Sequence, residues 1–225
     1  MVPILKNNTP QELINYINDR NSIGLTPYFD GMTQGVKPAI QKSLCEEQGY
    51  VCAYCMQRIK PDGRHMKIEH WDTQASNKAN LRMTVDYSIM LGCCLGRTQT
   101  TEHCDTFRGH INKIQNQQLK YNPSNTAHHS LLGITYEPNG KIHSSDTDFD
   151  KQLDKVLNLN DNYLCDKRKS IQDGILRSIQ MLKNNKIPYD INQIINSWKT
   201  KNSSGEYQEF YGTALYFLET NKNQL

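Results

Sequence analysis

The chain has 225 residues, of which 36 % are hydrophobic, with 26 basic and 23 acidic side chains and a net charge of +3 at pH 7. This length suffices for one large domain or two small ones, so a buried core can form without covalent cross-links. The weak net charge excludes a protein that coats nucleic acid through general electrostatics, so any nucleic-acid contact must be local. No apolar run is long enough for a signal peptide or a membrane span, and we expect a cytoplasmic protein without membrane contact.

The first region, residues 1–48, predicts a short extended start followed by two helices. Thr9 and Pro10 offer an N-cap and a first helical position, and this helix should end near Asn21. After a loop rich in glycine and proline, a second helix should run over residues 39–48 and close at the glycine that follows.

The second region, residues 49–118, holds the residue types that carry chemistry. In order, it should contain a CxxC knuckle (52–55), a hairpin (57–60 and 64–70), a polar loop (72–86), an apolar patch (89–91), a second knuckle and a helix (104–118). The third region, residues 119–225, shows patterns of secondary structure and no cluster of candidate catalytic residues. It predicts a hairpin around Asn139-Gly140, then helices over 148–157, 162–184, 190–198 and 207–220. The whole chain therefore predicts an α+β fold that is mostly α, with helical regions on both sides of a small central unit.

Cysteines are concentrated in the central stretch, where six of the seven lie within it or just before it. An odd number of cysteines in a reducing compartment argues against a disulfide framework and favours metal ligation. Two pairs about forty residues apart form the set that structural zinc prefers. The predicted zinc ligands are Cys52, Cys55, Cys94 and Cys104.

Two alternatives to this ligand set stay open. Cys93 and His103 are each adjacent to a predicted ligand and could take its place. Cys52 and Cys55 could instead be a redox pair, but the βαβ pattern that surrounds a thioredoxin-like site is absent here, so zinc is favoured.

Glu69 and His70 end the second predicted strand, between the two knuckles. Phosphodiester hydrolysis needs a base near neutrality, which histidine supplies, and a divalent ion, which carboxylates bind. Asp105, at the start of the next helix, is the natural partner of Glu69. The structural alternative is that His70 packs under Trp71 and that Asp105 only caps its helix.

The arrangement resembles the HNH, or ββα-metal, endonucleases. The resemblance extends to the retron- and Septu-associated HNH family through LCEEQGYVCAYCMQRI, IEHWDTQAS, YSIMLGCCLG, HCDTFRG and LNLNDNYLCDKR. It implies a small zinc-stapled ββα-metal centre, with His70 as the base and Glu69 and Asp105 as ligands of Mg²⁺ or Mn²⁺. It also implies Arg108 near the phosphate, cleavage of DNA in bacterial anti-phage defence, and a partner ATPase of the SMC-like or ABC type.

The sequence departs from the HNH pattern at one place. The middle Asn should lie near Ser88-Ile89, and its role in orienting the hairpin could fall to Asn77 or Asn80. Because of this departure, a second hypothesis stays open, in which the chain is a zinc-stabilised adaptor that binds DNA or protein and has lost catalysis. Basic residues on the predicted hairpin, Arg64 and Lys67 with Arg108 beyond it, would contact phosphates in either case.

Overall fold

The computed structural model of the protein describes residues 1–72, 79–115 and 118–225. This part of the chain is mostly helical and contains two small antiparallel sheets, so the expected mostly helical class is confirmed. The α-helices are α1 (Gln11–Ser22), α2 (Val36–Gln48), α3 (Cys104–Gln115), α4 (Thr147–Lys155), α5 (Asn162–Asn184), α6 (Ile191–Lys199) and α7 (Tyr211–Asn221). The strands are β1 (Lys67–His70), β2 (Met90–Cys93), β3 (Ile134–Tyr136) and β4 (Ile142–Ser144). Short 3-10 helices are η1 (Phe29–Gly31), η2 (Leu81–Val85), η3 (Tyr87–Ile89) and η4 (Thr126–Leu131).

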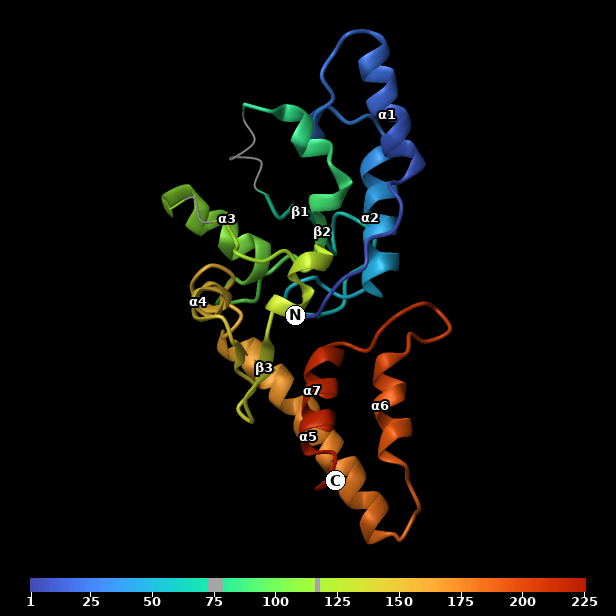
Figure 1. Cartoon of the computed structure of the whole chain (residues 1–225), viewed down its shortest axis with the longest axis vertical. Coiled ribbons are helices and arrows are strands. Elements are labelled where there is room, and N and C mark those ends of the chain that lie inside the picture. Colours follow the sequence, from blue (N-terminus) through green and yellow to red (C-terminus); the bar gives the residue numbers. More distant parts are fainter. Residues whose placement is uncertain (73–78, 116–117) are drawn as a thin grey trace.

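The molecule is elongated, with α1 and α2 at one end and α5, α6 and α7 at the other (Figure 1). The β1–β2 ribbon lies between these ends, against α2. The helices α3 and α4 lie on the side of the ribbon away from α2 (Figure 1). Helical regions therefore flank the small central unit, as the sequence predicted.

Helix ends follow the local signals where those signals are strong. α2 ends at Gln48, and Gly49 has the left-handed φ of 62° that a glycine after a helix adopts readily. A Cβ at Gly49 would lie 2.3 Å from a ring carbon of Tyr207, so close packing adds a second reason for glycine there. α5 covers the predicted span, and α6 begins after its cap, Asp190.

Several helix starts differ from the prediction. α2 begins at Val36, three residues before the predicted start at residue 39. Asp146, not Asp148, caps α4, because its carboxylate accepts from the amides of Asp148 and Phe149. α7 begins at Tyr211 instead of Tyr207, because the Tyr207 amide donates to the Gly49 carbonyl and holds that segment against the end of α2.

The predicted hairpin of residues 57–60 with 64–70 is wrong. β1 pairs instead with β2, in the register Ile68 opposite Gly92. β2 includes Met90 and Leu91 of the predicted apolar patch, while Ile89 ends η3. Asp62 folds the intervening residues into a turn, since its carbonyl accepts from the amides of His65 and Met66. β2 is buried along its whole length, and a strand with that burial is the stronger partner for β1.

The outer edge of β2 is closed by a side chain from α2. The Gln48 amide group donates to the Gly92 carbonyl at 2.8 Å and accepts from the Gly92 amide at 2.7 Å. It also donates to the Val51 carbonyl at 2.9 Å. One buried glutamine therefore takes the place of a third strand and joins α2, the first knuckle and β2.

The second predicted hairpin is confirmed. β3 and β4 pair antiparallel, and Gly140 in the turn between them has a φ of 85°. Its hypothetical Cβ would lie 2.0 Å from the Cys165 carbonyl oxygen, so the turn can approach α5 only with glycine.

The main hydrophobic cluster draws residues from all three predicted regions, for example Leu44, Leu91 and Phe149. A smaller second cluster lies between α5, α6 and α7 and includes Ile179, Ile195 and Leu218. Within the described ranges, no helix combines the length and the apolar character that a membrane span needs.

Candidate functional site

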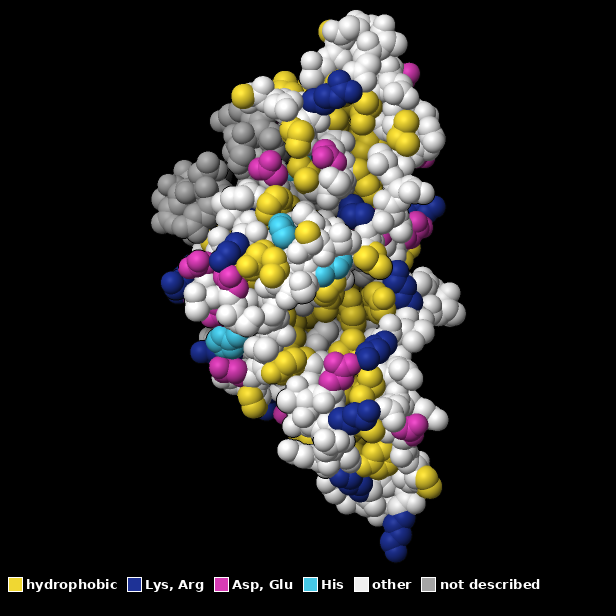
Figure 2. All heavy atoms as spheres, viewed as in Figure 1, with side chains coloured by type: hydrophobic (Ala, Val, Ile, Leu, Met, Phe, Trp, Pro, Cys, Tyr) yellow, Lys and Arg dark blue, Asp and Glu magenta, His cyan; other side chains and the backbone are white. Residues whose placement is uncertain are grey.

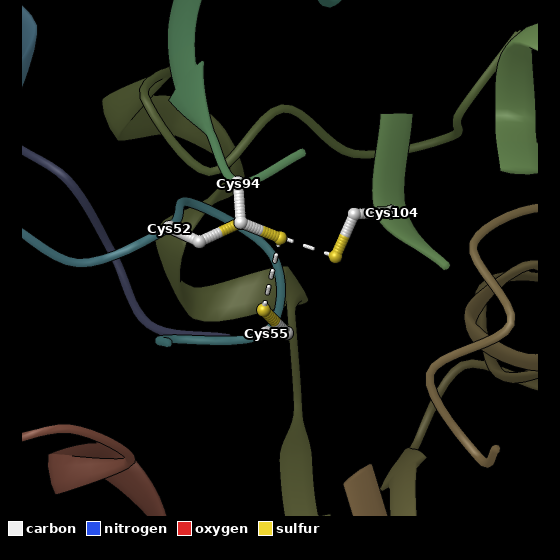
Figure 3. A group of neighbouring side chains, drawn as sticks. All are labelled: Cys52, Cys55, Cys94 and Cys104. Atoms are coloured by element: carbon white, nitrogen blue, oxygen red, sulfur yellow. Dashed lines mark hydrogen bonds between the residues drawn. The ribbon is translucent and has the colours of Figure 1, made fainter. Parts of the chain in front are cut away.

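Four cysteine thiols meet in the interior, at the place where the two knuckles approach each other (Figure 3). The members of this group are Cys52, Cys55, Cys94 and Cys104. Their sulfur atoms all lie within 4.8 Å of one another, with Cys52 and Cys104 3.9 Å apart and Cys55 and Cys94 3.6 Å apart. Zn–S bonds of about 2.3 Å in a tetrahedron put sulfur atoms about 3.8 Å apart, so this donor set fits zinc.

Local backbone geometry aims the thiols inward. In the first knuckle, the Cys52 amide donates to the Gln57 carbonyl and the Met56 amide to the Cys52 carbonyl, which closes a tight turn between the two cysteines. In the second, Gly96 has a φ of 62° and its carbonyl accepts from the His103 amide. A Cβ at Gly96 would lie 2.1 Å from the His103 carbonyl oxygen. Only glycine therefore allows the backbone at residue 96 to approach the backbone at His103 this closely.

The geometry separates the competing ligands. Cys94 belongs to the group, whereas Cys93 is the last residue of β2 and stands opposite Lys67 in the ladder. The His103 Nδ1 atom lies 3.2 Å from the Cys104 sulfur and 3.9 Å from the Cys94 sulfur, but His103 is not a member of the group whose ligand atoms all approach one another. All seven cysteines are free thiols, and Cys55 contacts Cys94 across the two knuckles, which favours a shared metal over a redox pair.

Glu69 and Asp105 lie against each other beside this centre. Glu69 is on β1 and only 7 % exposed, and Asp105 is in the first turn of α3. The pKa of the Glu69 carboxyl is well above its ordinary value, first because the group is buried and next because the Asp105 carboxylate is in hydrogen-bonding contact, with Arg108 opposing both. Two carboxylates held this close favour a proton or a cation between them.

Lys67 supplies part of that positive charge. It lies two residues before Glu69 on β1 and so on the same face of the strand. Its ammonium is 3.4 Å from the Asp105 carboxylate and donates to the Thr106 hydroxyl at 2.7 Å. Lys67 therefore stays near the acidic pair with its side chain 40 % exposed, while Arg64 is exposed in the preceding turn.

Arg108 lies elsewhere than expected from the resemblance. Its side chain is 1 % exposed and forms a salt bridge with Glu69. It also donates to the carbonyls of His70 at 3.3 Å and Trp71 at 2.7 Å. Arg108 thus binds the end of β1 to α3, and its guanidinium faces the interior instead of a phosphate in solvent.

His70 contacts two residues that are distant in the sequence, Phe29 before it and Thr84 after it. Its Nε2 is 2.9 Å from the Thr84 carbonyl oxygen, and the Phe29 ring meets it edge-on at 4.7 Å between centroids. A carbonyl can only accept, so Nε2 carries the proton and the lone pair of the neutral ring is on Nδ1. Burial lowers the pKa of His70, and the Thr84 hydrogen bond and the Asp105 charge oppose this only in part. The neutral ring that a general base requires is therefore favoured.

The three predicted catalytic residues are neighbours but not one ligand cluster. Among the described residues, the cysteine group is the one set of three or more side chains positioned to share an ion. Glu69 and Asp105 form a pair, and His70, next along the strand, approaches from the other face. The carboxylate pair fits a hard divalent ion that keeps several waters, as Mg²⁺ does.

Sequence patterns missed the residues that orient the centre. Gln48, Thr84 and Phe29 carry no motif, because each acts across a long stretch of chain. Asn80 only precedes η2 and makes no side-chain capping bond, and Asn77 lies outside the described residues. The Gln48 amide group, hydrogen-bonded to β2, provides the kind of bracing expected of the absent middle Asn.

The chain thus combines a four-cysteine centre of zinc type with an adjacent acidic pair and a histidine that is favoured in its neutral form. No protein-family model matches the sequence. The chain is 30 % identical over 105 residues to a candidate HNH endonuclease of retron Vc95 from Vibrio cholerae serotype O1 biovar El Tor, which covers 46 % of this chain and 50 % of that relative. It is 28 % identical over 131 residues to a candidate HNH endonuclease of retron Ec83 from Escherichia coli, covering 52 % of this chain and 50 % of the relative. The chain spans about half the length of the curated relatives it matches.

Proposed function

We propose that this chain is a metal-dependent HNH endonuclease that hydrolyses DNA phosphodiester bonds. The observation that carries the proposal is the contact between the carboxyl groups of Glu69 and Asp105, beside the buried His70. The names of the two retron relatives support a nuclease at the level of the family. In this proposal β1, β2 and α3 make the ββα-metal centre, with the cysteine group as its zinc staple.

The residues divide the chemistry between them. His70 accepts a proton at Nδ1 from the water that attacks phosphorus, while Thr84 holds the ring in the required tautomer. Glu69 and Asp105 would hold Mg²⁺ or Mn²⁺, which would neutralise the charge of the scissile phosphate. Arg108 is a positioning residue, since it fixes Glu69 and the backbone after His70. The four cysteines would hold a structural zinc ion that fixes β2 against α3 and takes no part in the reaction.

The biological setting is part of the same proposal. We infer a cytoplasmic effector of bacterial anti-phage defence that acts with an SMC-like or ABC-type ATPase, as in Septu systems. The support is the family resemblance of the sequence motifs and the retron names of the two relatives. The weak net charge of +3 agrees with recruitment to DNA by a partner.

The test is a plasmid-nicking assay with Mg²⁺ or Mn²⁺, on the full chain alone and with the product of the neighbouring gene. The wild type should cut, and His70→Ala and Asp105→Asn should not, although both should keep their zinc and the circular dichroism spectrum of the folded protein. Equal cutting by wild type and His70→Ala would refute a base at this position.

One observation favours the second function, a zinc-stabilised adaptor for DNA or protein. His70 is only 4 % exposed and hydrogen-bonded, as a purely structural histidine would be. For the adaptor, folded and zinc-loaded wild type should cut nothing in either setting, while DNA or protein binding should survive His70→Ala.

A further inference from the structure

The N-terminal region contributes directly to the surroundings of His70. η1 brings the Phe29 ring edge-on against the imidazole. The Phe29 amide donates to the Thr84 hydroxyl at 3.0 Å, and the Thr84 carbonyl is the acceptor for His70 Nε2. Residues about forty positions before the histidine thus help to set its position.

A lysine from the same region is held beside this aromatic ring. Lys37 is in the first turn of α2, and its ammonium lies 4.2 Å from the centroid of the Phe29 ring. The ammonium is also 3.9 Å from the Asp30 carboxylate, and the Lys37 side chain is 41 % exposed. A cation over an aromatic face and near a carboxylate is restrained in position, while its remaining donors stay open to water.

Phe29 connects Lys37 to the histidine. Its ring centroid is 4.7 Å from that of the imidazole and 4.2 Å from the Lys37 ammonium. Lys37 therefore belongs to the surroundings of His70, near enough to act on an anion that approaches the ring.

Two of the three cations expected to meet phosphate are engaged elsewhere, while Arg64 is exposed in the turn before β1. Arg108 is buried against Glu69, and Lys67 is paired with Asp105. A phosphodiester beside His70 needs a positive group at the solvent side of the ring, because its charge must be balanced as water attacks. Lys37 offers such a group, since its ammonium lies over the Phe29 ring that contacts the imidazole and its side chain is 41 % exposed.

We propose that Lys37 contacts the phosphate at the scissile bond, so that the N-terminal region supplies the substrate-facing cation of the nuclease centre. This inference rests on the proposed function and adds a substrate-contacting residue to it. Phe29 and Asp30 are positioning residues that hold the ammonium beside the base.

The experiment compares cleavage and binding by the full chain with its partner. Lys37→Ala and Lys37→Met remove the charge, and Met preserves most of the apolar contact with Phe29. Lys37→Arg keeps the charge. The matched control is Lys42→Ala, on the same helix with a side chain 70 % exposed.

Both neutral variants should lower kcat/KM for a short duplex about tenfold or more, with Lys37→Arg close to wild type and Lys42→Ala unchanged. In a His70→Ala background, which leaves the DNA intact, Lys37→Met should reduce the slope of log binding constant against log salt by about one. The thermal unfolding temperature of Lys37→Met without DNA should equal that of wild type, since a purely structural lysine would change it.

Two results overturn the inference in different ways. If His70→Ala abolishes cutting while Lys37→Met cuts and binds like wild type, the role of Lys37 is refuted and the nuclease stands. If His70→Ala cuts as fast as wild type, the proposed function itself fails, and the role of Lys37 fails with it.

Discussion

The side-chain amide of Gln48 hydrogen-bonds to both backbone groups of Gly92, its oxygen to the amide and its nitrogen to the carbonyl. The two residues are 44 positions apart, and both lie in the interior. Through this pair, α2 holds the outer edge of β2, and β2 in turn holds β1 with Glu69 and His70. The position of the strand that carries Glu69 and His70 therefore depends on a residue in the first helical region.

Gln48→Ala should lower the free energy of unfolding by about 3 kcal/mol, because the Gly92 amide and the Val51 carbonyl each lose a buried partner. Urea unfolding followed by circular dichroism measures this change. The control is Gln180→Ala, an exposed residue of α5 that should change stability by less than about 0.5 kcal/mol. Equal stability of the two variants would mean that the Gln48 amide does not brace β2.

Zinc content should distinguish the adjacent cysteines. The wild type should bind one zinc ion per chain, Cys94→Ala should lose it, and Cys93→Ala should keep it, because only Cys94 joins the thiol group. Elemental analysis of the purified proteins, together with release of zinc by a thiol reagent, measures the zinc bound per chain. Loss of zinc in Cys93→Ala with retention in Cys94→Ala would reverse the assignment.

Arg108→Met should destabilise the fold by about 3–5 kcal/mol, since it leaves the buried Glu69 carboxylate without its cation. The double variant Arg108→Met with Glu69→Gln should lose less, because no buried charge is left unpaired. Arg64→Met, at an exposed position, is the control and should have little effect on thermal unfolding. An unchanged unfolding temperature in Arg108→Met, together with weaker DNA binding, would restore a phosphate contact for this arginine.

The His70 ring should titrate below pH 6.5 in the folded protein, because burial lowers its pKa from that ordinary value. The unfolded chain then takes up a proton that the folded chain does not, so stability should fall as the pH drops below about 6.5. Nuclear magnetic resonance of the histidine ring carbons, with His70→Ala to assign the signal, measures the midpoint directly. A midpoint above pH 6.5 would contradict the burial of the ring.

The local part of the fold followed from short-range signals. The span of α5, the turn at Asn139-Gly140 and the end of α2 at Gly49 depend on neighbours a few residues apart, and the structure confirms them. The cysteine spacing also indicated the thiol group, since two close pairs limit which side chains can meet. Only the choice of Cys94 over Cys93 required coordinates, because both thiols lie near Cys52 and the distances among all four sulfur atoms select Cys94.

Strand pairing could not be predicted in the same way. The turn residues at 61–63 and the polarity of their neighbours predicted a hairpin of residues 57–60 with 64–70. β1 instead pairs with β2, about twenty residues away, since burial of a continuous apolar strand outweighs the short loop. Arg108, which the family resemblance placed near the phosphate, is buried in a salt bridge with Glu69.

The sequence by itself determined the helical regions, the small central unit and the thiol group, because capping, periodicity and cysteine spacing act over a few residues. Only the tertiary structure decided which strand β1 joins, and that Gln48, Thr84 and Phe29 surround the predicted site. The physical reason is that hydrogen bonding and desolvation of a buried group depend on whatever the folded chain brings beside it, at any distance along the sequence.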